Sequence, residues 1–153
     1  MARRALAPLT VRDFWNLPDD GNRWEIIDGP AFMTPTPTIA HQQVLLNLAI
    51  LFRAHARRRR LGEVLIAPVG VVLDEHSVVE PDLIFVARAQ RTIVRDKAIH
   101  GAPALLVEIT SPATASRDRG LKRDRYARAG VGCYWMIDPR MSTLRALRLG
   151  AAA

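Results

Sequence analysis

The sequence predicts an α/β protein with a central mixed β-sheet flanked by helices. Two patterns indicate this class. Apolar residues recur at three- and four-residue spacing between residues 39 and 60, which is typical of a helix, whereas short runs rich in Val, Ile and Leu recur from residue 63 onward. An order of helix, several strands, helix and strand is typical of a sheet with helices packed on it. Because 153 residues suffice for one core, we expect a single domain over residues 1–153.

The N-terminal part, about residues 9–34, is predicted to contain a short helix and a hairpin. Thr10 and Asp13 have the spacing of a capping box, which opens a helix. Asp28 followed by glycine favours a tight turn between two strands. The rest of the fold, about residues 38–139, is expected to carry the functional core.

The predicted helix over residues 39–60 ends in a run of arginines. We expect Gly62 to cap its C-terminus and the apolar residues to form one buried stripe. The arginines would either complement the helix dipole or contact phosphate groups, and the sequence leaves both interpretations open. The stripe consists of Val44, Leu45, Leu48, Leu51 and Phe52.

The remaining elements are predicted mainly as strands. Residues 63–74 form one or two strands with a turn near 74–77, residues 87–102 form a loose basic stretch, and residues 114–129 form a helix closed by glycine. The other strands are expected at 81–86, 104–109, 133–139 and 143–149.

The charge balance makes polyanions plausible partners. The formal net charge is +7, and only Lys97 and Lys122 are lysines among the 22 cationic residues. Arginine binds phosphate oxygens in a bidentate manner, although a genomic bias toward arginine codons explains the composition equally well. No apolar run is long enough to span a membrane, no secretory signal is evident, and the single cysteine favours the cytoplasm.

Three carboxylates occupy positions where a core residue is expected. Glu25 lies within WEII, Asp82 begins PDLIFV and Glu108 lies within LLVEI. A buried carboxylate without a cation, hydrogen bonds or a metal is costly. If the strands of Asp82 and Glu108 are neighbours, their carboxylates converge and repel each other unless a divalent cation lies between them. Hard oxygen ligands suit Mg²⁺ or Mn²⁺.

The helix after the Glu108 strand carries Asp118, Lys122 and Tyr126 at four-residue spacing, which predicts one shared face. Lys122 could then reach the carboxylates as a point charge. Purely structural interpretations remain open: a surface pair of Asp118 with Lys122, a strand-start cap at Asp82, and a pair of Glu25 with Arg23.

These segments resemble the PD-(D/E)XK nuclease superfamily, specifically its Uma-type branch of restriction endonucleases. The resemblance spans about residues 24–139 in the order of that branch, and the ordered set is what makes it specific. The matching segments are WEIIDG (24–29), HQQVLLNL (41–48), VEPDLIFV (79–86), LLVEITSPAT (105–114), DRGLKRDRYARAGV (118–131) and YWMIDP (134–139).

The resemblance implies a restriction-endonuclease-like fold and metal-dependent cleavage of DNA phosphodiester bonds. Asp82 and Glu108 match the two acids of the motif, and Lys122 matches a lysine displaced onto the next helix, because the usual lysine position holds Thr110. The expected cofactor is Mg²⁺ or Mn²⁺. Its predicted ligands are Asp82, Glu108 and the backbone carbonyl of Ile109, with Glu25 or His41 as alternatives for a further ligand.

Supporting roles are expected for Asp118, which would position Lys122, and for Tyr126, which would pack or hydrogen-bond behind it. A homodimer is expected, because cutting both strands of a duplex requires two sites. The alternative is an inactive nuclease-like module that binds nucleic acid or regulates a partner. The predicted phosphate contacts are Arg57, Arg60, Arg117, Arg119 and Arg123.

Overall fold

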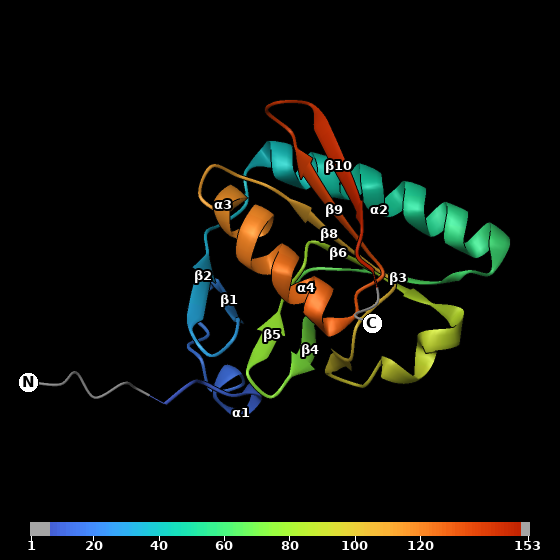
Figure 1. The fold of residues 1–153 in the computed structure, drawn as a ribbon. Coiled ribbons are helices and arrows are strands. Elements are labelled where there is room, and N and C mark those ends of the chain that lie inside the picture. The colour runs from blue at the N-terminus through green and yellow to red at the C-terminus, as the bar shows by residue number, and fades with distance from the viewer. Residues whose placement is uncertain (1–6, 151–153) are drawn as a thin grey trace, which may run out of the picture.

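Two mixed β-sheets of five strands organise residues 7–150, the part of the chain that the computed structural model describes (Figure 1). The first sheet has the strand order β2-β1-β5-β4-β7 and the second has the order β10-β9-β8-β6-β3. The α/β class predicted from the sequence is confirmed, with the strands divided between two sheets. The strands are β1 (Arg23–Ile26), β2 (Ala31–Thr34), β3 (Gly62–Ile66), β4 (Gly70–Asp74), β5 (Ser77–Val79), β6 (Leu83–Ala87), β7 (Ala98–His100), β8 (Leu105–Ile109), β9 (Cys133–Asp138) and β10 (Thr143–Arg148).

Helical segments connect and cover these sheets. None of those within residues 7–150 is long and apolar enough to cross a membrane. They are α1 (Val11–Phe14), α2 (Ile39–Arg59), the 3₁₀ segment η1 (Arg88–Ile93), α3 (Ala115–Arg117), the π segment η2 (Asp118–Lys122) and α4 (Arg123–Ala129).

The N-terminal helix and hairpin form as predicted. Thr10 and Asp13 make the reciprocal contacts of a capping box at the start of α1. The turn between β1 and β2 contains Asp28 and Gly29, both with positive φ, as a tight hairpin turn requires. This hairpin places Glu25 on β1, in the first sheet.

The predicted strand region 63–74 divides between the two sheets. β3 is an edge strand of the second sheet, whereas β4 belongs to the first sheet and forms a hairpin with β5 around the predicted turn. The stretch at 87–102, expected to be loose, contains η1 and the short strand β7, which pairs in parallel with β4. Because β7 has only three residues, it is too short to produce a recognisable alternation of apolar and polar residues in the sequence.

Helix α2 packs on one face of the second sheet through Leu45, as the stripe predicted. The inclusion of Leu51 in that stripe is wrong, because its side chain is 66% exposed on the outer side of the helix. The prediction of Gly62 as the C-cap is also wrong: Arg60 adopts the left-handed conformation that ends α2. Gly62 lies in β3 instead, where a Cβ atom would stand 2.0 Å from the carbonyl oxygen of Val86.

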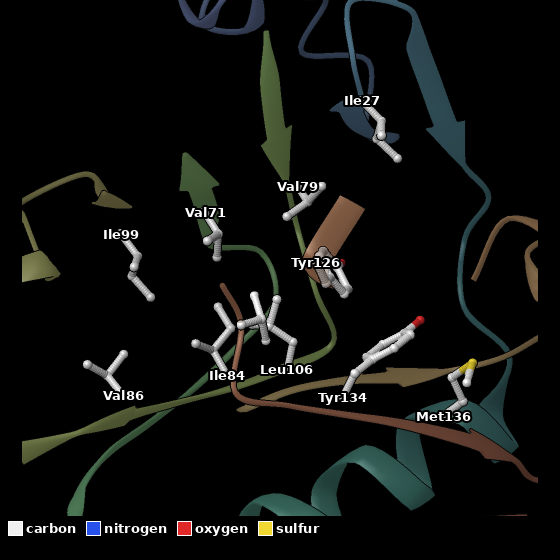
Figure 2. Close-up of a cluster of buried hydrophobic side chains, with 11 residues drawn as sticks. Ile27, Val71, Val79, Ile84, Val86, Ile99, Leu106, Tyr126, Tyr134 and Met136 are labelled. Carbon is white, nitrogen blue, oxygen red and sulfur yellow. The ribbon is translucent and has the colours of Figure 1, made fainter. Parts of the chain in front are cut away.

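The main core lies between the two sheets and α4. Figure 2 shows side chains from both sheets converging, with Tyr126 of α4 among them. Side chains alternate along β8: Leu106 faces this core, whereas Leu105 and Val107 face α2. The same alternation directs Glu108 into the inner layer, on the side of α4.

The predicted helix over 114–129 forms, with a π segment in its middle. Helix α4 is held against two turns of the first sheet by Arg125, a buried side chain. Its guanidinium donates to Ser77 Oγ at 2.9 Å, contacts Asp74 and lies 3.4 Å from Asp28 Oδ1. This arrangement fixes the helix face that carries Lys122 and Tyr126.

Candidate active site

Asp82 and Glu108 face each other on adjacent strands of the second sheet. Leu83 pairs with Val107 in the antiparallel ladder, so the residues immediately outside this pair, Asp82 and Glu108, are also opposite each other. The backbone N–H of Ile109 donates to Asp82 Oδ2 at 2.8 Å and fixes that carboxylate at the strand entry. Both acids are buried, with relative exposures of 2% and 3%.

Lys122 reaches Glu108 from the helical segment that follows β8. Its Nζ atom lies 2.8 Å from Glu108 Oε1 and 2.7 Å from Glu25 Oε1. The hydroxyl of Tyr126 also donates to Glu108 Oε1, at 2.8 Å. Thr110, at the position where the motif usually has its lysine, instead hydrogen-bonds the backbone carbonyl of Ile137. One lysine therefore joins two carboxylates from different sheets.

Glu25 supports Lys122 from behind. The backbone N–H of Glu80 donates to Glu25 Oε1 at 2.9 Å, and Arg117 lies 3.9 Å from its other oxygen. Glu25 Oε2 is buried without a hydrogen-bond partner within the described residues. The interpretation that pairs Glu25 with Arg23 is wrong, because Glu25 forms its short ion pair with Lys122 and Arg23 pairs with Asp82.

Arg23 and His41 both contact Asp82. Arg23 Nη1 lies 3.1 Å from Asp82 Oδ1, and His41 Nε2 lies 3.2 Å from Oδ2. His41 is in the first turn of α2, which Thr38 caps, so the start of this helix is directed at the acids. Sequence reasoning missed the role of Arg23 at Asp82.

A cavity of about 530 Å³ opens beside these residues. Its walls include both acids of the strand pair, Lys122, and the connectors on either side of the site, residues 34–38 and 110–114. Arg117 also lines it and donates to Thr34 Oγ1 at 2.9 Å. Glu25 and Tyr126 do not line this cavity; they contact the wall residues from the protein side.

The site carries more buried acid than one lysine neutralises. Burial raises the pKa of Glu108 to about 8, and nearby Asp118 and Asp82 act in the same direction against the charge of Lys122. Burial alone would lower the pKa of Lys122, but Glu108 and Glu25 outweigh it and hold the lysine charged. For Asp82 the penalty of burial is outweighed by the His41 hydrogen bond and by Arg23, so its pKa is lowered.

Asp118 is buried next to this cluster but is not within ion-pair distance of Lys122 in the described structure. Burial raises the pKa of Asp118, and its Oδ2 atom has no hydrogen-bond partner among residues 7–150. The surface-pair interpretation is wrong, because Lys122 is as buried as Asp118. The wider turn of the π segment offsets the two side chains, whereas a regular α-helix would stack them.

The five predicted phosphate contacts do not gather at the cavity. Arg117 lines it, whereas Arg119 lies 3.8 Å from Asp138 and Arg123 pairs with its neighbour Asp124 on the surface. The other two, Arg57 and Arg60, lie at the C-terminal end of α2, the opposite end from His41.

The predicted metal ligands on the cavity wall are Asp82 and Glu108, together with the neighbouring Ile109 and His41. Among residues 7–150, no group of three or more His, Cys, Asp or Glu side chains is arranged to hold a metal ion. Ile109, predicted to offer its carbonyl, lies on the cavity wall, as does His41. Glu25 is directed at Lys122.

Two mixed sheets with an acid–lysine cluster at their junction define a restriction-endonuclease-like protein. Residues 11–153 match the family Uma2, described as "Putative restriction endonuclease", and the chain belongs to that family. A nuclease-like function and a nucleic-acid substrate follow from this membership at the level of the family. The resemblance identified from the sequence is thus confirmed.

A solved structure from Anabaena variabilis has the same fold. It is described as a "putative nuclease belonging to DUF820" and matches with a TM-score of 0.79 at 19% identity, covering 93% of this chain and 80% of the other. No curated protein matches the sequence.

Proposed function

We propose that the protein is an endonuclease that hydrolyses phosphodiester bonds of DNA with Mg²⁺ or Mn²⁺. The observation that carries this proposal is the opposition of Asp82 and Glu108 at one cavity wall, with Lys122 bonded to Glu108. Membership of the Uma2 family supports nucleic acid as the substrate class. The choice of DNA rests on the description of that family as restriction endonucleases.

The donor set fits a hard divalent cation. The hydrogen bonds of Glu108 recorded within residues 7–150 all use Oε1, which leaves Oε2 available to a ligand. Mg²⁺ is commonly held by one or two carboxylates, with water and substrate phosphate completing its shell, so Asp82, Glu108 and the Ile109 carbonyl suffice without a third acid. A cation there supplies Lewis-acid activation of water and of the scissile phosphate.

The surrounding residues would position and neutralise the substrate. Lys122 lines the cavity, and Glu25 holds its ammonium group in place. The positive charge of Lys122 would therefore stabilise negative charge that develops on the phosphate. Arg117, held by Thr34, would bind a neighbouring phosphate oxygen. Tyr126 fixes the orientation of Glu108 through its hydroxyl.

The test is cleavage of supercoiled plasmid with Mg²⁺ or Mn²⁺ by the wild type, Glu108→Gln and Lys122→Met. Loss of one transition-state contact typically costs about 100-fold or more, so both variants should cleave at least that much more slowly. Circular dichroism confirms that each variant is folded. Equal nicking by all three proteins would assign the activity to a contaminant.

An inactive, nucleic-acid-binding module is the second candidate, because Asp82 is already satisfied by Arg23, His41 and the Ile109 N–H. Melting with increasing Mn²⁺ separates the two candidates. Stabilisation of the wild type but not of Asp82→Ala supports the enzyme. Cation-independent melting of both proteins supports the inactive module.

We further propose a homodimer, since two sites are needed to cut both strands of a duplex, and a cytoplasmic location, since Cys133 is a free thiol. Light scattering on the purified protein measures the first directly. A mass of one chain at micromolar concentration would contradict it.

A further inference from the structure

The arginines at the far end of α2 meet arginines from a distant part of the chain. A hollow of about 450 Å³ is lined by Arg60, Arg88 and Arg91. A second hollow, of about 300 Å³, is lined by Arg53 and Arg57. Both hollows also contain Gly62 and Glu63, so they adjoin each other at the start of β3. We call the five arginines around these hollows the distal basic surface.

The charges of the distal basic surface are not neutralised within the fold. All five arginines are exposed, and none forms an ion pair within residues 7–150. Elsewhere, Arg23, Arg119 and Arg128 each have a carboxylate within 4 Å. Among the described residues, Glu63 is the only acid that lines either hollow.

The helix dipole does not account for this arrangement. A dipole would favour cations in the last turn of α2 only, which explains Arg57 and Arg60. Arg88 and Arg91 lie on η1, after β6, and they are brought to the same hollow by the pairing of β3 with β6. Unpaired guanidinium groups converging on a concave surface fit phosphate oxygens.

The distal basic surface is separate from the cavity. Arg57 lies sixteen positions after His41 on α2, which at a rise of 1.5 Å per residue corresponds to about 24 Å along the helix. This distance is on the order of seven base pairs of a duplex, at about 3.4 Å per pair. A duplex that extends about seven base pairs beyond a scissile phosphate in the cavity therefore has the length needed to reach the distal basic surface as well.

We propose that the distal basic surface is a phosphate-binding site for the backbone of a DNA duplex, remote from the acid–lysine cluster. The inference rests on the proposed function for the identity of the polyanion. It assigns affinity to this surface and cleavage to the cavity, so the two properties separate in experiments. If DNA affinity does not depend on these arginines, an acidic protein partner is the alternative ligand for this surface.

The experiment is fluorescence anisotropy with a labelled 30-base-pair duplex in EDTA, at several NaCl concentrations. The triple variant Arg60→Ala/Arg88→Ala/Arg91→Ala should bind at least about 10-fold more weakly at low salt. The slope of log affinity against log salt should fall by about two to three, since each lost phosphate contact removes roughly one. Glu63→Gln should bind a few-fold more tightly.

The matched control is Arg12→Ala/Arg145→Ala/Arg148→Ala, which removes the same charge from exposed positions on α1 and β10. It should keep most of the salt slope. Equal weakening by both triple variants would reduce the effect to net charge and overturn the proposal, as would unchanged binding by the distal variant.

Cleavage measurements keep this inference distinct from the proposed function. In a plasmid titration with Mg²⁺, the distal variant should reach the maximal rate of the wild type at saturation and show a raised KM. Asp82→Asn should abolish cleavage and leave binding in EDTA within about threefold of the wild type. If the wild type binds through the distal basic surface but does not cut, the nuclease proposal fails and the binding site stands.

Discussion

Lys122 and Glu108 are bonded at 2.8 Å in the buried layer between helix and sheet, although the lysine lies fourteen positions further along the chain. The same ammonium group also contacts Glu25, which belongs to the other sheet. Removing it leaves two carboxylates in an apolar layer, whereas removing an exposed lysine has no such consequence.

Lys122→Met should therefore lower the free energy of unfolding by about 3 kcal/mol, because the partners of a broken buried ion pair remain unsatisfied. Urea denaturation measures this change. Lys97→Met is the matched control: Lys97 is exposed, and its replacement should change stability by less than about 0.5 kcal/mol. Equal losses in the two variants would contradict the buried pair.

Tyr126→Phe should cost about 2 kcal/mol, since the hydroxyl donates to a buried acid. Tyr134→Phe serves as the control, because its hydroxyl donates to the backbone carbonyl of Asp118 instead. Loss of the Tyr126 donor should also raise the pKa of Glu108 further, which a pH series of melting temperatures would reveal. A pH response identical to that of Tyr134→Phe would argue against the contact.

The stability of the metal-free protein should fall as the pH rises from about 5 to about 8 and should level off above that. Burial raises the pKa of Glu108 to about 8 in the fold, from an ordinary value of 4.5, so the folded state holds this proton more tightly than the unfolded state. The resulting stabilisation is complete below the unfolded pKa and is lost as the pH passes through about 8. Melting in EDTA measures it.

Over the same range the stabilisation by Mn²⁺ should increase, because a carboxylate ligand must lose its proton before it binds a cation. Glu108→Gln removes the titrating group and should flatten both trends. Trends that survive intact in Glu108→Gln would assign the titration to another residue.

Arg125→Met should destabilise the protein by about 3 kcal/mol, because this buried guanidinium joins α4 to Ser77, Asp74 and Asp28. Arg123 is exposed, and its one ion pair within residues 7–150 is with its neighbour Asp124, so Arg123→Met should cost less than about 1 kcal/mol. Calorimetry of the two variants provides the comparison. Comparable melting temperatures would show that the contacts of Arg125 contribute nothing.

Which residues gather at the candidate site could be predicted from the sequence more fully than the contacts that they make there. Glu108 is recognisable because an acid interrupts an apolar strand, and Lys122 because lysine is rare in this chain. Local patterns cannot predict that Lys122 takes Glu25 while Arg23 takes Asp82, since these contacts depend on how the two sheets pack. The offset of Asp118 arises from the π segment, which has no sequence period of its own.

The features of the fold that depend on local periodicity and turn residues could be predicted from the sequence, whereas those that depend on long-range strand pairing could not. The capping box at Thr10 and the turn at Asp28 are local features and are confirmed. The division of residues 63–74 between two sheets depends on long-range pairing of β3 with β6 and of β4 with β5 and β7. The sequence predicts Gly62 as a helix cap, because its close contact with Val86 depends on the pairing of β3 with β6, which local patterns do not reveal.

The bridge that Lys122 makes between β1 and β8 has a consequence for the order of assembly. Glu25 belongs to the first sheet and Glu108 to the second, so a chain that has folded only one sheet cannot complete the cluster of acids around Lys122. During refolding, cleavage activity should return with the last docking event and not with the first recovery of helix or strand signal. A change that separates the two sheets should therefore abolish the proposed cleavage activity before the chain unfolds completely.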